Sequence, residues 1–344
     1  MNHEIDLNKY EIRTDLIDET IENNNINNID SKEEIIDDIY ITTVNLDKTN
    51  SKLLNKKDGT YITIKFNDIT DYNNKEKVKN VLKNELNKLI KKLNLKKDAF
   101  ALIIGLGNEK STPDSLGPLT IKNIVVTNHL YELNELDDGF RPVAAFSPNV
   151  TGVTGIETSK LIKSIVNEIK PDFLICIDSL ASGSIDRLNK TIQLTDTGIH
   201  PGSGVGNKRK EISYNTIKIP VIAIGVPTVV DATIIVSDTI NYMQKHYVFN
   251  KKFQNDPMSK LTISSSVNYL KQNLKITSED KKELLGLLGN FNEEEIRELV
   301  FEVLNPIGYN LMVTPKEIDF VIEKLSDIVG NGINKALHEK IDNI

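Results

Sequence analysis

The central part of the chain repeats one pattern that strongly limits how it can fold. A short apolar or β-branched run ends in Gly, Asp or Pro and is then followed by a helical pattern. This occurs at residues 101–105, 142–148, 173–178 and 221–227. Short apolar runs that are bounded by turn residues and separated by amphipathic helices are typical of parallel strands covered on both faces. The sequence therefore predicts an α/β fold with a mainly parallel sheet sandwiched by helices.

Residues 1–59 have a different composition. They are polar and rich in asparagine, above all at residues 23–28, and their apolar side chains are too few to offset the entropy that ordering would cost. We therefore expect a loose polar arm. From about Thr60 the pattern changes to an alternating strand at residues 61–66 and then to apolar residues at helical spacing from Val78 to Leu93. The compact domain is predicted to begin near Thr60.

The C-terminal third is predicted to be helical. Helical patterns cover residues 293–304, 315–329 and 332–341, and the second pattern opens with Thr314 as an N-cap followed by Pro315 and an acidic first turn. No chemistry is obvious in this part, which we interpret as packing and assembly material.

Charge and cysteine content exclude several classes of protein. The 344 residues include 42 Lys and Arg against 49 Asp and Glu, a net charge of -7, so no basic surface for nucleic acid is expected. The only cysteine, Cys176, lies in an apolar run, which excludes an internal disulfide and fits a reducing cytoplasm. No run of 18 apolar residues and no secretory signal occurs, so no membrane association is predicted.

Two carboxylates follow strands of the predicted parallel sheet. Asp178 ends a wholly apolar strand, and Asp114 follows the Gly105–Asn108 turn at the mouth of a helix. Each could be a helix cap. Because both lie at the carboxyl edge of the sheet, where ligands bind, they could instead form a pair that shares a proton. Such a pair can activate water and protonate a leaving amine.

Other chemistries are open at the same edge. With His200, the only histidine in a loop rich in turn residues, the two aspartates could hold a metal. The Gly105–Asn108 turn could serve a non-enzymatic ligand-binding module, although the third glycine of a dinucleotide fingerprint is missing. Residues 202–209 are flexible and basic, as a substrate-gripping loop or a solvated loop would be. A serine or cysteine hydrolase lacks support, because no Gly-X-Ser-X-Gly elbow occurs and Cys176 is expected to be buried.

Several segments in order along the chain resemble the germination protease family of endospore-forming bacteria. The matching segments are residues 10–16, 112–118, 149–158, 177–181, 197–209 and 226–232. The resemblance implies an endopeptidase with a fold similar to hydrogenase maturation endopeptidases, a homotetrameric assembly, and no metal or cofactor. It places the two catalytic aspartates at Asp114 and Asp178. The pepsin-like triplet at residues 196–198 is then a decoy.

The resemblance also implies a substrate and a mode of activation. Family members degrade the small acid-soluble proteins that protect spore DNA, in the cytoplasm of the forespore or spore core, and remove their own propeptide. The matching bond is Asp15–Leu16. The expected parts are a propeptide at residues 1–15, a polar arm at 16–59 and a peptidase domain with C-terminal helices at 60–344. Candidates for lining the substrate cleft are Thr154, Gly155, His200, Gly202, Ser203, Lys208 and Arg209. The alternative is a metal-dependent endopeptidase related to hydrogenase maturation proteases.

Overall fold

The computed structural model describes residues 14–24, 26, 29–202, 209–254, 274–304 and 311–342. The chain divides into two compact units, which we name the sheet unit and the helical unit. The sheet unit comprises residues 13–230 and 314–344, and the helical unit contains residues 231–313. Each unit is described by itself.

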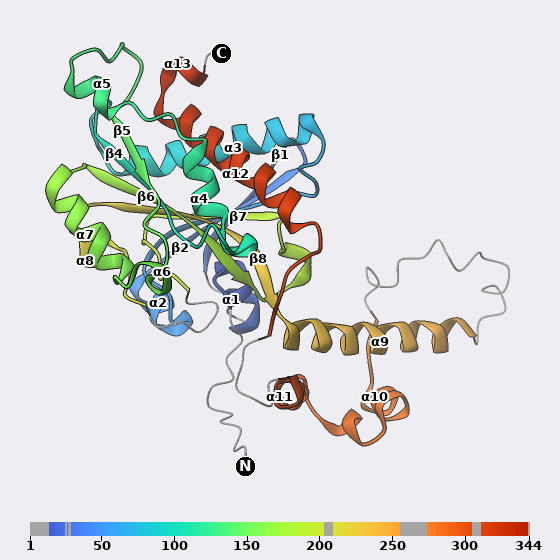
Figure 1. The fold of residues 1–344 in the computed structure, drawn as a ribbon. Helices are drawn as coiled ribbons and strands as arrows, with labels where there is room; N and C mark the ends of the chain where they lie inside the picture. The colour runs from blue at the N-terminus through green and yellow to red at the C-terminus, as the bar shows by residue number, and fades with distance from the viewer. Residues whose placement is uncertain are drawn as a thin grey trace. The chain divides into compact units, whose positions relative to one another are not determined.

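The sheet unit holds most of the secondary structure labelled in Figure 1. Its strands are β1 (Asp30–Ile36), β2 (Ile39–Leu46), β3 (Gly59–Lys65), β4 (Ala101–Gly105), β5 (Val143–Phe146), β6 (Phe173–Ser182), β7 (Thr191–Thr195) and β8 (Val221–Asp231). Its helices are α1 (Ile17–Asn24), α2 (Lys48–Leu54), α3 (Tyr72–Lys92), α4 (Leu116–Lys122), α5 (Asn128–Glu132), α6 (Thr151–Thr154), α7 (Thr158–Ile169), α8 (Tyr214–Ile217), α12 (Ile318–Leu337) and α13 (Glu339–Asp342), with the 3-10 turns η2 (Thr112–Asp114) and η3 (Ile185–Arg187).

The strands form a mixed sheet in the order β1-β2-β3-β7-β8-β6-β4-β5. Strands β8, β6, β4 and β5 are parallel to their neighbours in this group, as the central sequence pattern predicts. Strands β1, β2, β3 and β7 pair antiparallel, and β7 joins β8 in the same way. The α/β fold with helices on the sheet is confirmed, and the parallel half is extended by an antiparallel half.

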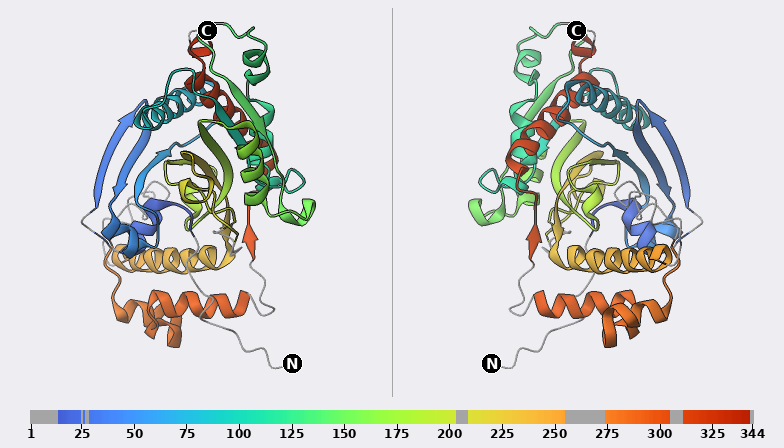
Figure 2. Two further views of the ribbon diagram at one scale, coloured as in Figure 1. Left: turned by 90° about the vertical axis from the view of Figure 1, so that its left-hand side faces the viewer. Right: turned by 90° about the vertical axis from the view of Figure 1, so that its right-hand side faces the viewer.

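Alternate residues of the parallel strands face two different cores. Ile103, Ile175 and Ile177 belong to the larger core, together with apolar residues of α3 and α12. Leu174 and Cys176 face the opposite side, where α7 packs. This alternation follows from the two-residue period of a strand. Figures 1 and 2 show α12 running alongside α3 and α4, which it contacts. Both faces of the sheet are therefore covered by helices. A ligand can then reach the parallel strands only at the edges of the sheet.

The N-terminal part differs from the expected loose arm. Residues 30–46 form β1 and β2, and Ile17 of α1 packs in a small core with Val44 and Tyr61. Strand β2 buries alternate apolar residues, whereas β1 is an exposed and charged edge strand. Charged residues are what an edge strand needs to avoid pairing with other molecules. Polar composition therefore does not distinguish this edge strand from a loose arm.

The C-terminal helix also differs from its prediction. The two expected helices at residues 315–329 and 332–341 are one helix, α12, which begins at Ile318 and runs through Gly330 and Gly332. A Cβ on Gly330 would lie 2.7 Å from the Asn123 Cβ, and a Cβ on Gly332 would lie 2.7 Å from Leu82 Cδ2. These glycines permit close helix packing. Thr314 is not the N-cap.

The helical unit contains α9 (Ala232–Gln254), α10 (Ser278–Leu285), the 3-10 turn η8 (Gly286–Asn290), α11 (Glu293–Leu304) and the short strand β9 (Met312–Val313). The predicted helix at residues 293–304 is confirmed as α11. Val236, Ile240, Leu299 and Val300 line an apolar pocket between its helices. The helical character expected of the C-terminal third is thus confirmed.

Candidate active site

Asp178 lies within the central strand β6, which continues to Ser182, so the prediction that Asp178 ends this strand is wrong. Asp178 is paired in register with Gly225 of β8, and only 4% of its surface is exposed. The backbone N–H of Ser179 donates a hydrogen bond to Asp178 Oδ1 at 2.9 Å. Burial raises the pKa of Asp178 well above its usual value, and the nearby charges of Asp114 and Asp15 raise it further. The buried carboxyl therefore favours its protonated form.

Asp114 is held in η2 by a tight arrangement of backbone. Its carbonyl accepts a hydrogen bond from the Asn108 N–H at 2.9 Å. Gly107 has a φ of +109°, and a Cβ there would lie 2.1 Å from the Asp114 carbonyl oxygen, so only glycine fits. The Thr228 hydroxyl of β8 donates to the Pro113 carbonyl at 2.6 Å. Strand β8 thus fixes the turn that carries Asp114.

The two aspartates form a pair with different proton affinities. Burial raises the pKa of Asp114 to about 6, while the positive charge of Arg209 and a backbone hydrogen bond from Asn108 oppose the rise. Asp114 therefore ionises first, and its negative charge then raises the pKa of Asp178. Burial and mutual repulsion therefore favour a pair of carboxyl groups that share one proton. Asp114 thus lies close enough to Asp178 for its charge to act on that carboxyl group, although Asp178 lies within β6 and not at its end.

Asp15 lies beside this pair. Its backbone N–H donates to the Ala181 carbonyl at 3.1 Å, and the Ala181 N–H donates to Asp15 Oδ2 at 2.9 Å. Ala181 lies three residues after Asp178 on the same strand. The next two residues, Leu16 and Ile17, are completely buried. The Asp15–Leu16 peptide bond is therefore held against the end of the strand that carries Asp178.

The Asp15 carbonyl oxygen accepts two hydrogen bonds. Gln193 Nε2 donates to it at 3.2 Å, and Lys56 Nζ at 3.3 Å. The Lys56 ammonium also donates to the Thr14 carbonyl at 3.2 Å, and the Gln193 Oε1 accepts from the Ile17 N–H at 2.7 Å. Neither side chain could be identified from the sequence, because Lys56 lies in a polar segment typical of a solvated turn and Gln193 lies on strand β7, which no sequence pattern predicted.

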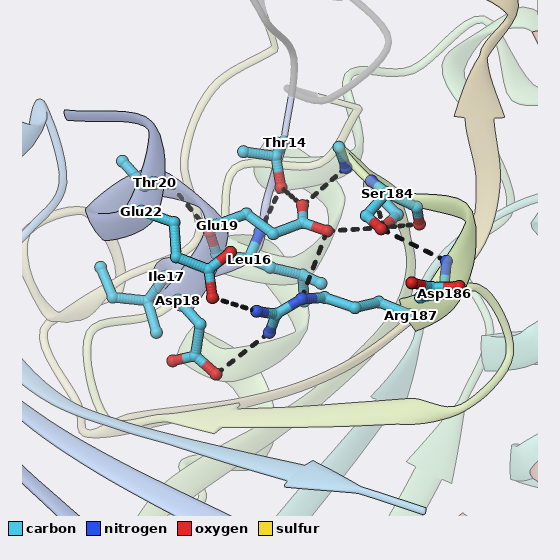
Figure 3. A network of polar contacts seen from close by, with 12 residues as sticks. Thr14, Leu16, Ile17, Asp18, Glu19, Thr20, Glu22, Ser184, Asp186 and Arg187 are labelled. Carbon is cyan, nitrogen blue, oxygen red and sulfur yellow. Dashed lines mark hydrogen bonds and ion pairs between the residues drawn. The ribbon is translucent and has the colours of Figure 1, made fainter. Parts of the chain in front are cut away.

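A second group of polar contacts fixes the segment after Asp15 (Figure 3). Glu19, which is 3% exposed, accepts hydrogen bonds from the Ser182 hydroxyl at 2.8 Å, from the Gly183 N–H at 2.6 Å and from the Thr14 hydroxyl. Arg187 of η3 forms ion pairs with Asp18 at 3.2 Å, Glu19 at 3.6 Å and Glu22 at 2.6 Å. These contacts join α1 to the loop that follows β6, and no sequence motif signalled them.

A pocket opens beside Asp15 within the sheet unit. Its lining includes Asp15, Lys56, Tyr61, Gln193, Thr197, His200 and Gly225. His200 Nε2 lies 3.1 Å from Glu211 Oε2, and partial burial lowers the pKa of the imidazole. His200 therefore belongs to the pocket wall.

The other predicted cleft residues are distributed differently. Thr154 and Gly155 end the exposed helix α6, and a Cβ on Gly155 would meet no atom within 4 Å. Gly202 is in a turn with a φ of +72°. Arg209 lies near enough to lower the pKa values of both aspartates. Ser203 and Lys208 lie outside the described residues.

The alternatives left open by the sequence find little support in this geometry. Within the described part of the chain, no group of three His, Cys, Asp or Glu side chains, including Asp114, Asp178 and His200, could hold a metal ion. A Cβ on Gly105 would lie 2.3 Å from the Gly117 carbonyl, so the protein's own backbone fills the glycine turn proposed for a ligand. Asp196 of the pepsin-like triplet pairs with Lys92 at 2.6 Å and has a structural role.

The mixed α/β sheet, the buried Asp178 with the half-buried Asp114 near it, and the segment of chain bound beside them form a site of the kind that hydrolytic enzymes use. Comparison with known proteins identifies the family. The family model described as germination protease matches residues 7–344, so the chain belongs to the germination protease family, a family of endopeptidases.

Curated relatives agree along almost the whole chain. The germination protease of Bacillus subtilis is 45% identical over 358 residues, covering 98% of this chain and 96% of that protein. The germination protease of Oceanobacillus iheyensis is 46% identical over 354 residues, covering 97% of this chain and 96% of that protein. The germination protease of Bacillus velezensis is 45% identical over 359 residues, covering 99% and 97%.

Among solved structures, the expected similarity to hydrogenase maturation proteases is found but is weak. The NiFe hydrogenase maturation protease HycI of Thermococcus kodakarensis matches 41% of this chain and 80% of that chain, with a TM-score of 0.26 and 15% identity. The fold assignment therefore rests on the sheet itself. No helix among the described residues is long and apolar enough to cross a bilayer.

Proposed function

We propose that this protein is an endopeptidase made as a zymogen, which removes its own residues 1–15 and then begins the degradation of small acid-soluble spore proteins during germination. The family assignment and the names of the relatives support this role. The single observation that carries the self-processing step is the pairing of Asp15 with Ala181, at the end of the strand that bears Asp178.

In the proposed reaction, Asp114 is the general base and Asp178 the general acid. The Asp114 carboxylate accepts a proton as water attacks the Asp15 carbonyl carbon, and Asp178 donates a proton to the Leu16 nitrogen as the C–N bond breaks. The products are a carboxylate at Asp15 and a free amine at Leu16. The raised pKa of each aspartate supports this division, since Asp114 ionises before Asp178.

The contacts of the bound segment are consistent with a preference for an acidic residue before the cleaved bond and an aliphatic residue after it. The Ala181 N–H binds the Asp15 carboxylate, and Leu16 occupies a fully buried position. We further propose that the protein acts as a homotetramer in the cytoplasm of the forespore or spore core, with protein substrates that are free of DNA. Arg209, Gly202, Ser203, Lys208, His200, Thr154 and Gly155 remain candidates for contacts to substrate.

A digestion of purified small acid-soluble spore protein tests the proposed substrate. The processed wild-type chain is expected to give fragments whose new N-termini are aliphatic and follow an acidic residue, with and without a chelator. The matched Asp178→Asn chain, expressed from residue 16 onward, should give none. An intact substrate after incubation with processed wild type would contradict the substrate assignment, and activity that a chelator abolishes and a divalent ion restores would favour a metal-dependent enzyme.

A further inference from the structure

Two side chains outside the aspartate pair meet at the carbonyl of the bond that we propose is cleaved. Gln193 Nε2 and Lys56 Nζ donate to the Asp15 carbonyl oxygen at 3.2 Å and 3.3 Å. Gln193 is 7% exposed. A peptide carbonyl that accepts one amide and one ammonium donor in a largely buried position is polarised toward nucleophilic attack.

The orientation of the Gln193 side chain is fixed by a second hydrogen bond. Its Oε1 accepts from the Ile17 N–H at 2.7 Å, and a backbone N–H can only donate. The amide nitrogen of Gln193 must therefore face the Asp15 carbonyl. Gln193 thus contacts both the Asp15 carbonyl oxygen and the Ile17 N–H. The Asp15–Leu16 bond lies between these two contacts along the chain.

The register of the sheet places Gln193 in line with Asp178. Gln193 of β7 pairs with Gly225 of β8, and Gly225 pairs with Asp178 of β6. Paired residues of neighbouring strands point to the same face of a sheet. The position between the two side chains is Gly225, and the Leu180 side chain packs over it, since a Cβ on Gly225 would lie 2.4 Å from Leu180 Cδ1. The side chains of Gln193 and Asp178 therefore lie on the same face of the sheet, on either side of Gly225, and Gln193 contacts Asp15 from this face.

Lys56 adds a positive charge at the same oxygen. Burial lowers its pKa, while the charges of Asp15 and Glu19 oppose that shift. When water attacks the Asp15 carbonyl carbon, the carbonyl oxygen gains negative charge. In the proposed reaction the carboxyl groups of Asp114 and Asp178 transfer protons, while Gln193 and Lys56 already donate hydrogen bonds to this oxygen.

From this geometry we propose that Gln193 and Lys56 form an oxyanion-stabilising site for cleavage of the Asp15–Leu16 bond and of substrate bonds that bind in the same place. This inference rests on the self-processing proposed above. Removing one such donor from an oxyanion site in other hydrolases slows the reaction by roughly 100- to 1,000-fold. Similar losses are expected here, and they should appear in the rate of bond cleavage while the segment stays bound.

The test measures the first-order rate at which the full-length chain loses residues 1–15, by intact mass. Gln193→Glu keeps an acceptor for the Ile17 N–H but removes the donor, and Lys56→Met removes the charge. Each should slow processing by about 100-fold or more, and Lys56→Arg should recover part of the rate. Lys52→Met is the matched control, because Lys52 is an exposed lysine of the same pocket, and it should process at the wild-type rate.

Hydrogen exchange separates stabilisation of the oxyanion from simple docking. In an Asp178→Asn background, residues 17–24 should remain as protected with Gln193→Glu as without it. Wild-type processing rates in both Gln193→Glu and Lys56→Met would overturn the inference, as would a loss of rate that matches a loss of protection. A wild-type chain that is never cut at Asp15–Leu16 would instead remove the proposed self-processing, and the inference with it.

Discussion

Glu19 and Asp178 are two buried acidic residues that lie in or beside the N-terminal segment beginning at Asp15. They differ in the groups that surround their carboxyl groups. Glu19 and Asp178 are 3% and 4% exposed. Glu19 accepts hydrogen bonds from Ser182 and Gly183 and lies beside Arg187. Asp178 accepts one from Ser179 and lies among the negative charges of other aspartates, which raise its pKa.

The comparison shows that burial alone does not decide what a carboxyl group does. A carboxylate supplied with donors and a cation can bind another part of the chain, as Glu19 does. In the same network of contacts, burial raises the pKa of Asp18 against the opposing charge of Arg187. A carboxyl group buried beside like charges keeps a proton that it can transfer. In our account, the Glu19 network, which we define as Asp18, Glu19, Glu22 and Arg187, holds the N-terminal segment, and the aspartate pair cuts it.

The largest effect on stability is expected from the Glu19 network. Arg187→Met leaves the carboxylates of Asp18 and Glu19 without their cation in a largely buried place, so the free energy of unfolding should fall by about 3 kcal/mol. Denaturant unfolding measures this change. Hydrogen exchange of residues 17–24 should rise, and self-processing should slow because the Asp15 carbonyl is held less firmly.

Lys190→Met is the control for this change, because it removes a positive charge from an exposed residue of the same loop. It should alter the free energy of unfolding by less than about 0.5 kcal/mol. A loss below about 1 kcal/mol for Arg187→Met, of the size typical of a surface ion pair, would contradict the assigned role.

Removing a carboxylate of the aspartate pair should have the opposite effect and increase the free energy of unfolding. The pKa of Asp114 in the folded protein is about 6, above its ordinary value of 3.8, so ionising this group costs stability as the pH rises. Asp114→Asn should therefore raise the free energy of unfolding at pH 7 by up to about 3 kcal/mol, and the gain should disappear below about pH 4, where Asp114 is protonated in both states. Denaturant unfolding at a series of pH values checks both statements.

Asp186→Asn serves as the control at an exposed aspartate near the site, and its stability should follow the wild type at every pH. An Asp114→Asn protein that is less stable than wild type at pH 7 would show that this carboxylate is stabilised by partners, as Glu19 is, and would break the contrast between the two groups.

The parallel half of the sheet could be predicted from sequence, and of the antiparallel half only the strand at residues 61–66, which is β3. Apolar runs such as residues 173–177 report burial on both faces and locate the parallel strands, although β6 continues past its run to Ser182. This is why Asp114 and Asp178 could be expected to meet. Strand β1 carries the charges of an edge strand and so has the composition of a loop.

The side chains that contact the segment after Asp15 could not be predicted from the sequence either. Gln193 lies 178 positions after Asp15 in the sequence, and Glu19 and Ser182 are separated by 163. Such contacts depend on the register of strands and leave no local pattern. Thr314 shows the converse, because its hydroxyl donates to the Thr228 carbonyl at 2.9 Å rather than capping a helix. Local signals predicted elements, and tertiary contacts decided how their side chains are used.

The most direct test of the central claim is the intact mass of the full-length chain during incubation, for wild type, Asp178→Asn and Asp186→Asn. We expect wild type and Asp186→Asn to lose residues 1–15 and begin at Leu16, while Asp178→Asn, folded as judged by circular dichroism, keeps its full mass. Cleavage of the Asp15–Leu16 bond in Asp178→Asn at the wild-type rate would contradict the assignment of Asp178 as a catalytic residue.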